Sequence, residues 1–209
     1  MPVAHQLSMW DVAESASLGP LGDRVTRHHL SRGAWLDHLP AWVLGSDEVL
    51  EVLLGDIGWR SDRRQMYDRE VAVPRLLRWY AGGEELPHPL LDDARGALDQ
   101  HYAAELGEPF VSAGLCLYRD GRDSVAWHGD TIGRGRSTDT MVAIVSFGSP
   151  RVLALRPVGG GESLRFPLGH GDLVVMGGSC QRTWEHAVPK TAAPVGPRVS
   201  VQFRPRGVA

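Results

Sequence analysis

Short apolar runs, separated by turns that contain glycine or proline, make up the chain from Phe110 to its end. Apolar runs of this length with turn residues between them are typical of β-strands. Gly159-Gly160-Gly161 separates two of the runs and predicts a tight hairpin. The expected strands cover residues 111–118, 125–127, 141–147, 152–156, 163–168, 173–176, 183–186 and 199–203. About eight short strands at this spacing predict a mainly β fold, a double-stranded β-helix or jelly roll.

The first half of the chain adds helices that should flank these strands. Apolar residues recur at helical spacing over residues 46–57, with Ser46 as the expected N-cap. Gly55 or Gly58 should end this helix. A second helix is expected over residues 87–106, where a proline suits the first turn and a glycine follows the last apolar position.

Two further segments are less regular. Residues 1–22 are weakly patterned and are interpreted as partly irregular. The pattern over residues 24–43 mixes two periods and does not separate strand from helix. Its two tryptophans, Trp35 and Trp42, are interpreted as core residues.

Composition sets the size and charge of the molecule. A chain of 209 residues with 43% apolar residues predicts one domain with a proper core, and we expect a monomer. The formal net charge is −3 and the sequence pI is about 6.3. The net charge therefore gives no sign of nucleic-acid binding, and any contact with a nucleic acid must come from a local group of basic residues.

Other function classes are disfavoured by what the sequence contains. Two cysteines, Cys116 and Cys180, are too few for a disulfide framework or a zinc cluster. No apolar run approaches the roughly 20 residues of a membrane span, and the N-terminus lacks the features of a signal peptide. We therefore expect a cytoplasmic protein with no membrane partner and with reduced thiols.

The motif Trp127-His128-Gly129-Asp130, taken together with the distant His186, is the candidate for chemistry. Two imidazoles and one carboxylate are the ligand set of a mononuclear non-haem iron(II) site, which leaves positions open for a cosubstrate and dioxygen. Residues i and i+2 of an extended strand point to the same side, so His128 and Asp130 can chelate one ion. The third ligand must come from a strand that is distant in sequence.

A second His-x-Asp pair, His170 and Asp172, competes with this motif. It lies in a glycine-rich turn that leads into an apolar strand, and the path from there to His186 is too short to wrap a sheet. We therefore interpret His170 as a turn residue and Asp172 as a residue of the turn or the strand start.

Two arginines, Arg198 and Arg204, lie on the last predicted strand. Arginine grips a carboxylate through two parallel hydrogen bonds, and the usual cosubstrate of such iron sites is the dicarboxylate 2-oxoglutarate. A metal site of purely structural use would not need two such residues.

Residues 59–83 mix basic and aromatic side chains, as nucleic-acid-binding surfaces do. The alternative is a solvated arginine face that is balanced by nearby acids, and the sequence leaves both open. The basic residues are Arg60, Arg63, Arg64, Arg69, Arg75 and Arg78, the aromatic ones Trp59, Tyr67, Trp79 and Tyr80, and the acids Asp62, Asp68 and Glu70.

Three segments together resemble the AlkB family of dioxygenases. They are residues 117–130, which contain the Trp-His-Gly-Asp motif, residues 177–189, which contain Trp-Glu-His, and the pattern Arg198-x-Ser200-x-x-x-Arg204. The resemblance covers the C-terminal half closely and residues 59–83 more loosely. The combined pattern is specific, whereas no single piece would be.

The resemblance implies a role for each matching residue. His128, Asp130 and His186 would hold Fe(II), and Tyr118, Arg198 and Arg204 would bind 2-oxoglutarate, with Arg204 steadying its carboxylate at the iron. The family usually has asparagine at two further cosubstrate positions, where this chain has Cys116 and Ser200.

The resemblance also implies an organisation. Residues 1–108 would form an N-terminal α/β extension with a nucleotide-recognition lid, and residues 109–209 the jelly-roll core. Substrate contacts are expected from Arg75 and Tyr80 in the lid and from Trp127 beside the metal motif. Arg151, at a strand start, could reach the substrate or a structural acid.

The implied activity is oxidative dealkylation of N-alkylated nucleobases in DNA or RNA, with Fe(II), 2-oxoglutarate and O2. The products would be the free base, an aldehyde, succinate and CO2. Two alternatives stay open from the sequence: a 2-oxoglutarate oxygenase that hydroxylates a protein or small molecule, and a non-catalytic metal-binding jelly-roll protein.

Overall fold

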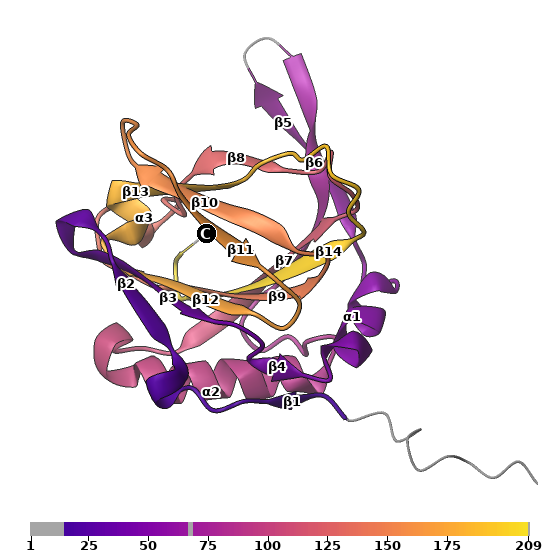
Figure 1. Ribbon diagram of the computed structural model, residues 1–209, viewed down its shortest axis with the longest axis horizontal. Helices are drawn as coiled ribbons and strands as arrows, with labels where there is room; N and C mark the ends of the chain where they lie inside the picture. The colour runs from indigo at the N-terminus through magenta and orange to yellow at the C-terminus, as the bar shows by residue number, and fades with distance from the viewer. Residues whose placement is uncertain (1–14, 67–68, 209) are drawn as a thin grey trace, which may run out of the picture.

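The computed structural model describes residues 15–66 and 69–208, and their side chains except those of residues 62–72. Two antiparallel sheets pack face to face, and the longer helices cover the outer face of the larger sheet (Figure 1). In spatial order the larger sheet contains β2 (Thr26–His29), β3 (Ala34–Leu39), β12 (Leu173–Gly178), β9 (Val142–Gly148), β14 (Arg198–Pro205), β7 (Phe110–Tyr118), β6 (Arg69–Tyr80) and β5 (Arg60–Met66). The smaller sheet contains β11 (Leu164–Leu168), β10 (Arg151–Pro157), β13 (Trp184–Val188) and β8 (Val125–His128).

Short elements complete the fold. A two-stranded sheet joins β1 (Ser17–Leu18) to β4 (Val43–Leu44). The helices are α1 (Ser46–Leu54), α2 (Pro89–Leu106) and the single turn α3 (Cys180–Thr183), and the 3-10 turns are η1 (Gly22–Arg24), η2 (Ser31–Gly33) and η3 (Arg134–Arg136). Among the described residues, no helix is both long and apolar enough to cross a membrane.

The predicted jelly roll is confirmed, and each strand expected beyond Phe110 is present within one or two residues of its predicted bounds. The glycine triplet joins β10 to β11 as an antiparallel hairpin. The first half of the chain also contributes to the larger sheet, because β3 pairs with β12 along its whole length.

Residues 24–43, which the pattern left unassigned, form the antiparallel pair β2–β3 and the short strand β4. Trp42 is fully buried, and its indole N–H donates to the Gly19 carbonyl at 2.9 Å. The ring of Trp35 stacks on Tyr102 of α2. Both tryptophans are therefore core residues as expected, and their contacts to separate elements explain why no single period was visible.

The two expected helices are confirmed, although α1 ends at Leu54, where Gly55 follows as one of the two expected stops, and α2 starts at Pro89. Ser46 is the first residue of α1 and not its cap, because Gly45 takes the cap position with a left-handed φ of 60°. The cap of α2 is His88, whose Nδ1 accepts a hydrogen bond from the Leu90 N–H at 3.1 Å. Helix α2 ends at Gly107, which has φ 72°.

Strand alternation creates two cores. One lies between the larger sheet and the helices and contains Val199, Val201 and Phe203 of β14. The other lies between the two sheets, where Met176 of β12 and Leu155 of β10 are fully buried. Successive side chains of a strand point to opposite faces, so every central strand serves both layers.

The turn before β12 uses the second His-x-Asp pair structurally, as expected. Nδ1 of His170 accepts a hydrogen bond from the Gly148 N–H at 2.7 Å. The Asp172 carboxylate accepts from the N–H groups of Ala41 at 2.8 Å and Gly169 at 2.7 Å. Burial opposes the ionisation of Asp172, but His38 and the two backbone donors outweigh it and hold the carboxyl pKa below its usual value. This carboxylate ties the β3–β4 connection to the start of β12.

We expect Asp172→Ala to lower the free energy of unfolding by about 1–3 kcal/mol, because two N–H groups lose their acceptor. The folded-state pKa is depressed, so the ionic part of this stabilisation is present above the unfolded pKa of about 3.9 and is lost as pH falls through the folded value. Urea unfolding of both proteins at neutral and acidic pH measures the difference. An equal loss at both pH values would contradict this assignment.

Candidate functional site

A cavity of about 1150 Å³ opens between the two sheets. Its floor comes from alternate residues of β14 and from neighbouring residues of β7, and its walls come from β8 and β13 on one side and β6 on the other. The β5–β6 hairpin extends from the edge of the larger sheet beyond the body of the molecule (Figure 1). The side chains of Arg63, Arg64 and Arg69 and of the acids Asp62 and Glu70 lie outside the described residues, as do Tyr67 and Asp68.

His128, Asp130 and His186 converge in this cavity. His128 ends β8 and lies directly across from His186 of β13, with ring centroids 4.2 Å apart. His128 Nε2 lies 3.8 Å from Asp130 Oδ1, and one ligand atom from each of the three residues lies within 4.8 Å of the others. The predicted metal ligands are therefore brought together, and Asp130 and His186 are both buried.

Hydrogen bonds orient the first of these imidazoles. His128 Nδ1 lies 2.9 Å from the Ala126 carbonyl oxygen and 3.1 Å from that of His186. Because both neighbours are acceptors, Nδ1 is the nitrogen that donates to them, and Nε2 is the ring nitrogen that faces Asp130. An imidazole held through its other nitrogen is the usual arrangement of a metal ligand.

Arg204 and Gln181 fix the carboxylate. Arg204 donates to Asp130 Oδ2 from Nε at 3.0 Å and lies 2.9 Å from it through Nη2. The Asp130 N–H donates to Gln181 Oε1 at 2.9 Å. Burial opposes the ionisation of Asp130, but Arg204 and the two imidazoles outweigh burial and keep its pKa below the usual value. Asp130 is therefore an anion at neutral pH.

The pKa of His186 is also lowered, and for an imidazole this favours the neutral form. Burial, and then the neighbouring His128, lower the pKa of His186 to about 3. A neutral imidazole beside a carboxylate is the protonation state that a divalent cation requires of its ligands. The donor set, two imidazole nitrogens and one carboxylate, thus fits Fe(II).

Arg198 lies deeper in the same cavity. Its side chain is only 2% exposed, its Nε donates to Ser146 Oγ at 2.8 Å, and its guanidinium carbon lies 5.3 Å from the centre of the Tyr118 ring. Burial lowers the pKa of Arg198, but a guanidinium stays charged in proteins. Its Nη1 has no hydrogen-bond partner among the described residues. A buried cation with a free donor fits a carboxylate ligand, as 2-oxoglutarate would supply.

The other expected cosubstrate residues line the cavity beside it. Burial raises the pKa of Tyr118 to about 12, so its hydroxyl stays protonated and can donate. Cys116 and Ser200 are directly opposite each other on β7 and β14. The amide of Gln202 lies between them, donating to Ser200 Oγ at 2.6 Å and lying 3.8 Å from Cys116 Sγ through Oε1.

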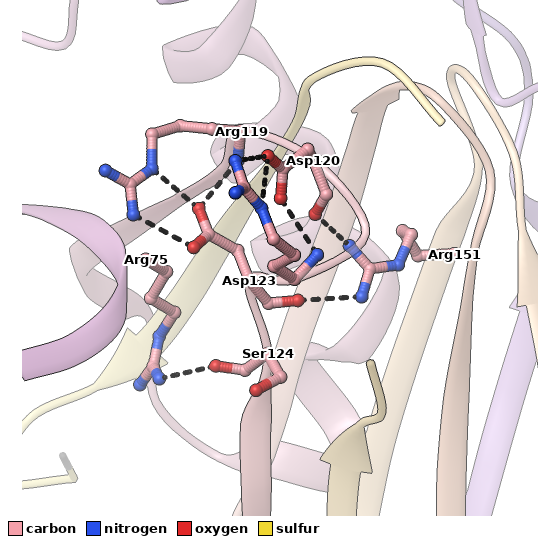
Figure 2. A network of polar contacts seen from close by, with 7 residues as sticks. Arg75, Arg119, Asp120, Asp123, Ser124 and Arg151 are labelled. Carbon is pink, nitrogen blue, oxygen red and sulfur yellow. Dashed lines mark hydrogen bonds and ion pairs between the residues drawn. The ribbon is translucent and has the colours of Figure 1, made fainter. Parts of the chain in front are cut away.

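Two of the four expected substrate contacts, Arg75 and Trp127, line the cavity. Arg75 Nη1 donates to the Ser124 carbonyl at 3.3 Å, and its Nε has no partner among the described residues (Figure 2). Trp127 is half-buried, and the guanidinium of Arg156 lies 4.3 Å from its ring centre. Both residues are placed where a ligand in the cavity could meet them.

Tyr80 and Arg151 are placed elsewhere, and neither lines the cavity. Tyr80 lies an odd number of positions from Arg75 on β6, so its ring points into the helix-side core under Arg78. Arg151 is buried, and its guanidinium donates to the carbonyls of Asp120 at 3.0 Å and Asp123 at 2.8 Å (Figure 2). It holds the loop after β7 and is a structural residue.

Sequence reasoning did not find Gln181 or Gln202. The signal for Gln202 was present, because it shares the period-two face of Arg198 and Arg204 on the last strand. Gln181 lies in the short helix α3, and nothing in the pattern indicates that its side chain meets the backbone of Asp130.

Comparison with known proteins agrees with this geometry. The model of the 2OG-Fe(II) oxygenase superfamily matches residues 46–204. The alpha-ketoglutarate-dependent dioxygenase alkB homolog 3 of Homo sapiens is 32% identical over 193 residues, which covers 78% of this chain and 64% of that protein. The DNA oxidative demethylase ALKBH2 of Arabidopsis thaliana is 33% identical over 130 residues, which covers 51% of this chain and 41% of that protein.

The chain thus spans less than two thirds of the length of these curated relatives. The resemblance to the AlkB family that the motifs predicted is confirmed by the relatives' names and by their identity to this chain. Fe(II), 2-oxoglutarate and O2 are the cofactors that the matched family implies, and the cavity holds residues that fit the first two. The match over residues 46–204 shows that this chain belongs to the 2OG-Fe(II) oxygenase superfamily.

Proposed function

We propose that this protein is an Fe(II)- and 2-oxoglutarate-dependent dioxygenase that removes N-alkyl groups oxidatively from nucleobases in DNA or RNA, releasing aldehyde, succinate and CO2. One observation carries the proposal: the His128–Asp130–His186 cluster shares a cavity with the buried Arg198 Nη1, which has no partner in the part of the chain that the structure describes. A metal site and a carboxylate site side by side are what a 2-oxoglutarate oxygenase needs. The relative from Arabidopsis thaliana is itself called a DNA oxidative demethylase.

The residues have separate tasks in this proposal. His128, Asp130 and His186 would hold Fe(II), while Gln181 and Arg204 keep the Asp130 carboxylate in place. Arg198 and the Tyr118 hydroxyl would grip the far carboxylate of 2-oxoglutarate. Bound Fe(II) and 2-oxoglutarate would supply, with O2, the oxidising power that hydroxylates the N-alkyl carbon, after which the base and the aldehyde separate.

Arg204 needs a different description from the one that the resemblance suggested. Its guanidinium is engaged with Asp130 and lies 3.4 Å from Gln202 Oε1 through Nη2. The guanidinium of Arg204 packs closely against Gly114 of β7, where a Cβ would lie only 2.7 Å from Arg204 Nη1. We infer that Arg204 acts on the cosubstrate mainly by holding the metal's carboxylate.

The shape and charge of the cavity favour a nucleic-acid substrate. Its volume of about 1150 Å³ exceeds the roughly 300–1000 Å³ of common ligand pockets, which leaves room for a base beside the cosubstrate. Among the described lining residues, Asp130 is the single acidic one, whereas the basic ones are Arg60, Arg75, Arg78, Lys190, Arg198 and Arg204. The local field is therefore positive although the whole chain carries −3.

The β5–β6 hairpin would serve as the lid over the substrate. Its base contributes Arg60, Arg75, Leu77 and Trp79 to the cavity, and Trp79 is 43% exposed. An exposed aromatic ring next to basic side chains suits a base and its phosphates.

Gly129, between two of the metal ligands, is a point where the backbone approaches another segment closely. A Cβ at this position would lie 2.5 Å from the backbone oxygen of Gln181. That residue also holds the Asp130 N–H, so a side chain at position 129 would push apart the two segments that set the carboxylate.

The direct test of the proposal is aldehyde release from a panel of N-methylated DNA and RNA oligonucleotides with Fe(II), 2-oxoglutarate and ascorbate. We expect release from at least one member, and Asp130→Ala should abolish it because two imidazoles alone hold Fe(II) weakly. His170→Ala is the matched control and should keep most of the activity. Succinate formation without aldehyde from any member would point to another substrate class and would contradict the proposal.

Gly129→Ala should weaken binding of Mn(II), a redox-stable substitute for Fe(II), by at least about tenfold. Misplacing one ligand group commonly costs a metal site ten- to a hundredfold. Isothermal titration with Mn(II) measures the loss without any turnover. Gly96→Ala in α2, where a Cβ meets nothing within 4 Å, is the control and should bind Mn(II) as the wild type does. Equal affinity in both variants would show that the segments can move apart freely.

Cys116→Asn should lower the apparent 2-oxoglutarate constant about two- to tenfold, because an amide N–H is a better donor than a thiol and one neutral hydrogen bond is worth roughly 0.5–1.5 kcal/mol. The maximal rate should change little, because the charge-assisted contact to Arg198 dominates. Titration of 2-oxoglutarate against succinate release compares the two proteins. A constant that is equal or higher in the variant would mean that residue 116 does not meet the cosubstrate.

A further inference from the structure

A shallow groove of about 220 Å³ lies on the outer face of the smaller sheet, behind the wall of the cavity. Ala154 of β10 pairs with Ala187 of β13 on one side and with Arg165 of β11 on the other. Two neighbouring alanines leave a depression because their side chains end at Cβ. Trp127 of β8 stands at the opposite border of the groove from Arg165.

Two exposed cations, Arg165 and Lys190, line the groove. Arg165 and Lys190 are exposed, and within the described ranges neither has a carboxylate at ion-pairing distance. Arg156 is different, since its Nε donates to Glu185 Oε2 at 3.0 Å and its guanidinium covers Trp127. The Arg156–Glu185 pair thus supports the Trp127 ring, whereas Arg165 and Lys190 can contact an anion.

The groove is continuous with the cavity. Strand β8 is the edge strand of the smaller sheet, and residues 124–127 and Lys190 line both hollows. A ligand in the cavity that extended over this edge would therefore enter the groove. Pockets for drug-sized ligands start at about 300 Å³, so the groove, at about 220 Å³, is smaller than these and suits one segment of a longer chain.

We propose that this groove binds the part of a polynucleotide that flanks the base in the cavity. The strand crosses the edge of β8, a phosphate lies between Arg165 and Lys190, and the flanking nucleotide lies against Trp127. This inference rests on the proposed function, because it takes the occupant of the cavity to be a base. DNA and RNA share the phosphodiester that the two cations would contact.

The test is the affinity for unmodified single-stranded DNA and RNA oligonucleotides, measured by fluorescence anisotropy at several salt concentrations. Arg165→Ala should weaken binding severalfold and should reduce the slope of log affinity against log salt by about 0.7, the value for one phosphate contact on a single strand. Arg24→Ala removes another exposed arginine, one that lies outside both hollows, and is the matched control, which should change neither quantity.

Wild-type affinity and slope in Arg165→Ala would overturn the inference, as would an equal loss in Arg24→Ala or a wild-type protein that binds no oligonucleotide. The proposed function can fail separately. Binding with an Arg165-dependent slope, but without aldehyde release from any alkylated oligonucleotide, would leave the groove in place and remove the reaction. Aldehyde release that is unchanged in Arg165→Ala, together with an unchanged slope, would keep the reaction and remove the groove.

Discussion

The buried ion pair between Arg204 and Asp130 is the contact on which the rest of the site depends. Two charged groups withdrawn from water cost more than they return unless each has several well-placed partners. Asp130 has such partners: two guanidinium nitrogens of Arg204 contact its Oδ2, and its backbone N–H donates to the side-chain oxygen of Gln181. A carboxylate held in this way stays ionised beside the neutral imidazole of His186, and that is the state in which it can bind a cation.

The same strand supplies both the scaffold and the ligand residues. On β14, Val199, Val201 and Phe203 are fully buried against the helices, and the residues between them face the cavity. The apolar face anchors the strand, and this lets the polar face hold two arginines at fixed positions. Nη1 of Arg198 has no partner among residues 15–66 and 69–208, and a carboxylate ligand would satisfy this buried donor.

Charge is organised locally in this protein and not globally. The chain is slightly acidic, yet the described cavity lining has a single acid, and the groove behind it carries Arg165 and Lys190. Acidic residues are used where they fix loops, as Asp123 does by accepting hydrogen bonds from the backbone and side chain of Arg119 (Figure 2). A net-charge argument therefore says little about which surface meets a polyanion.

Cys116, Ser200 and Gln202 form a cluster whose chemistry differs from the two asparagines that the family resemblance led us to expect at positions 116 and 200. The Gln202 amide bridges the space between the thiol, the hydroxyl and Arg204. It joins the carboxylate end of the cavity to the metal end through contacts within hydrogen-bonding reach. The two residues that depart from the family pattern are thus opposite each other on neighbouring strands, and both contact Gln202.

Some features followed from the sequence because they depend on local pattern. Short apolar runs separated by turn residues determined the strands beyond Phe110, and the His-x-Asp spacing determined that His128 and Asp130 share a side. The choice of this pair over His170 and Asp172 also followed, because chain length limits which strands can meet. Residues 24–43 were not assigned, because Trp35 and Trp42 pack on different elements and no single period describes them.

Only the tertiary structure decided which long side chains reach the cavity. Arg75 and Tyr80 are equally plausible ligands in the sequence, but the pleat of β6 sends them to opposite faces of the sheet. Arg151 was expected as a possible substrate contact, but its guanidinium donates to the carbonyls of a loop. Gln181 was not predicted from the sequence, but its side chain accepts a hydrogen bond from the backbone N–H of Asp130. Such roles depend on contacts between segments distant in the chain, and local pattern carries no information about those contacts.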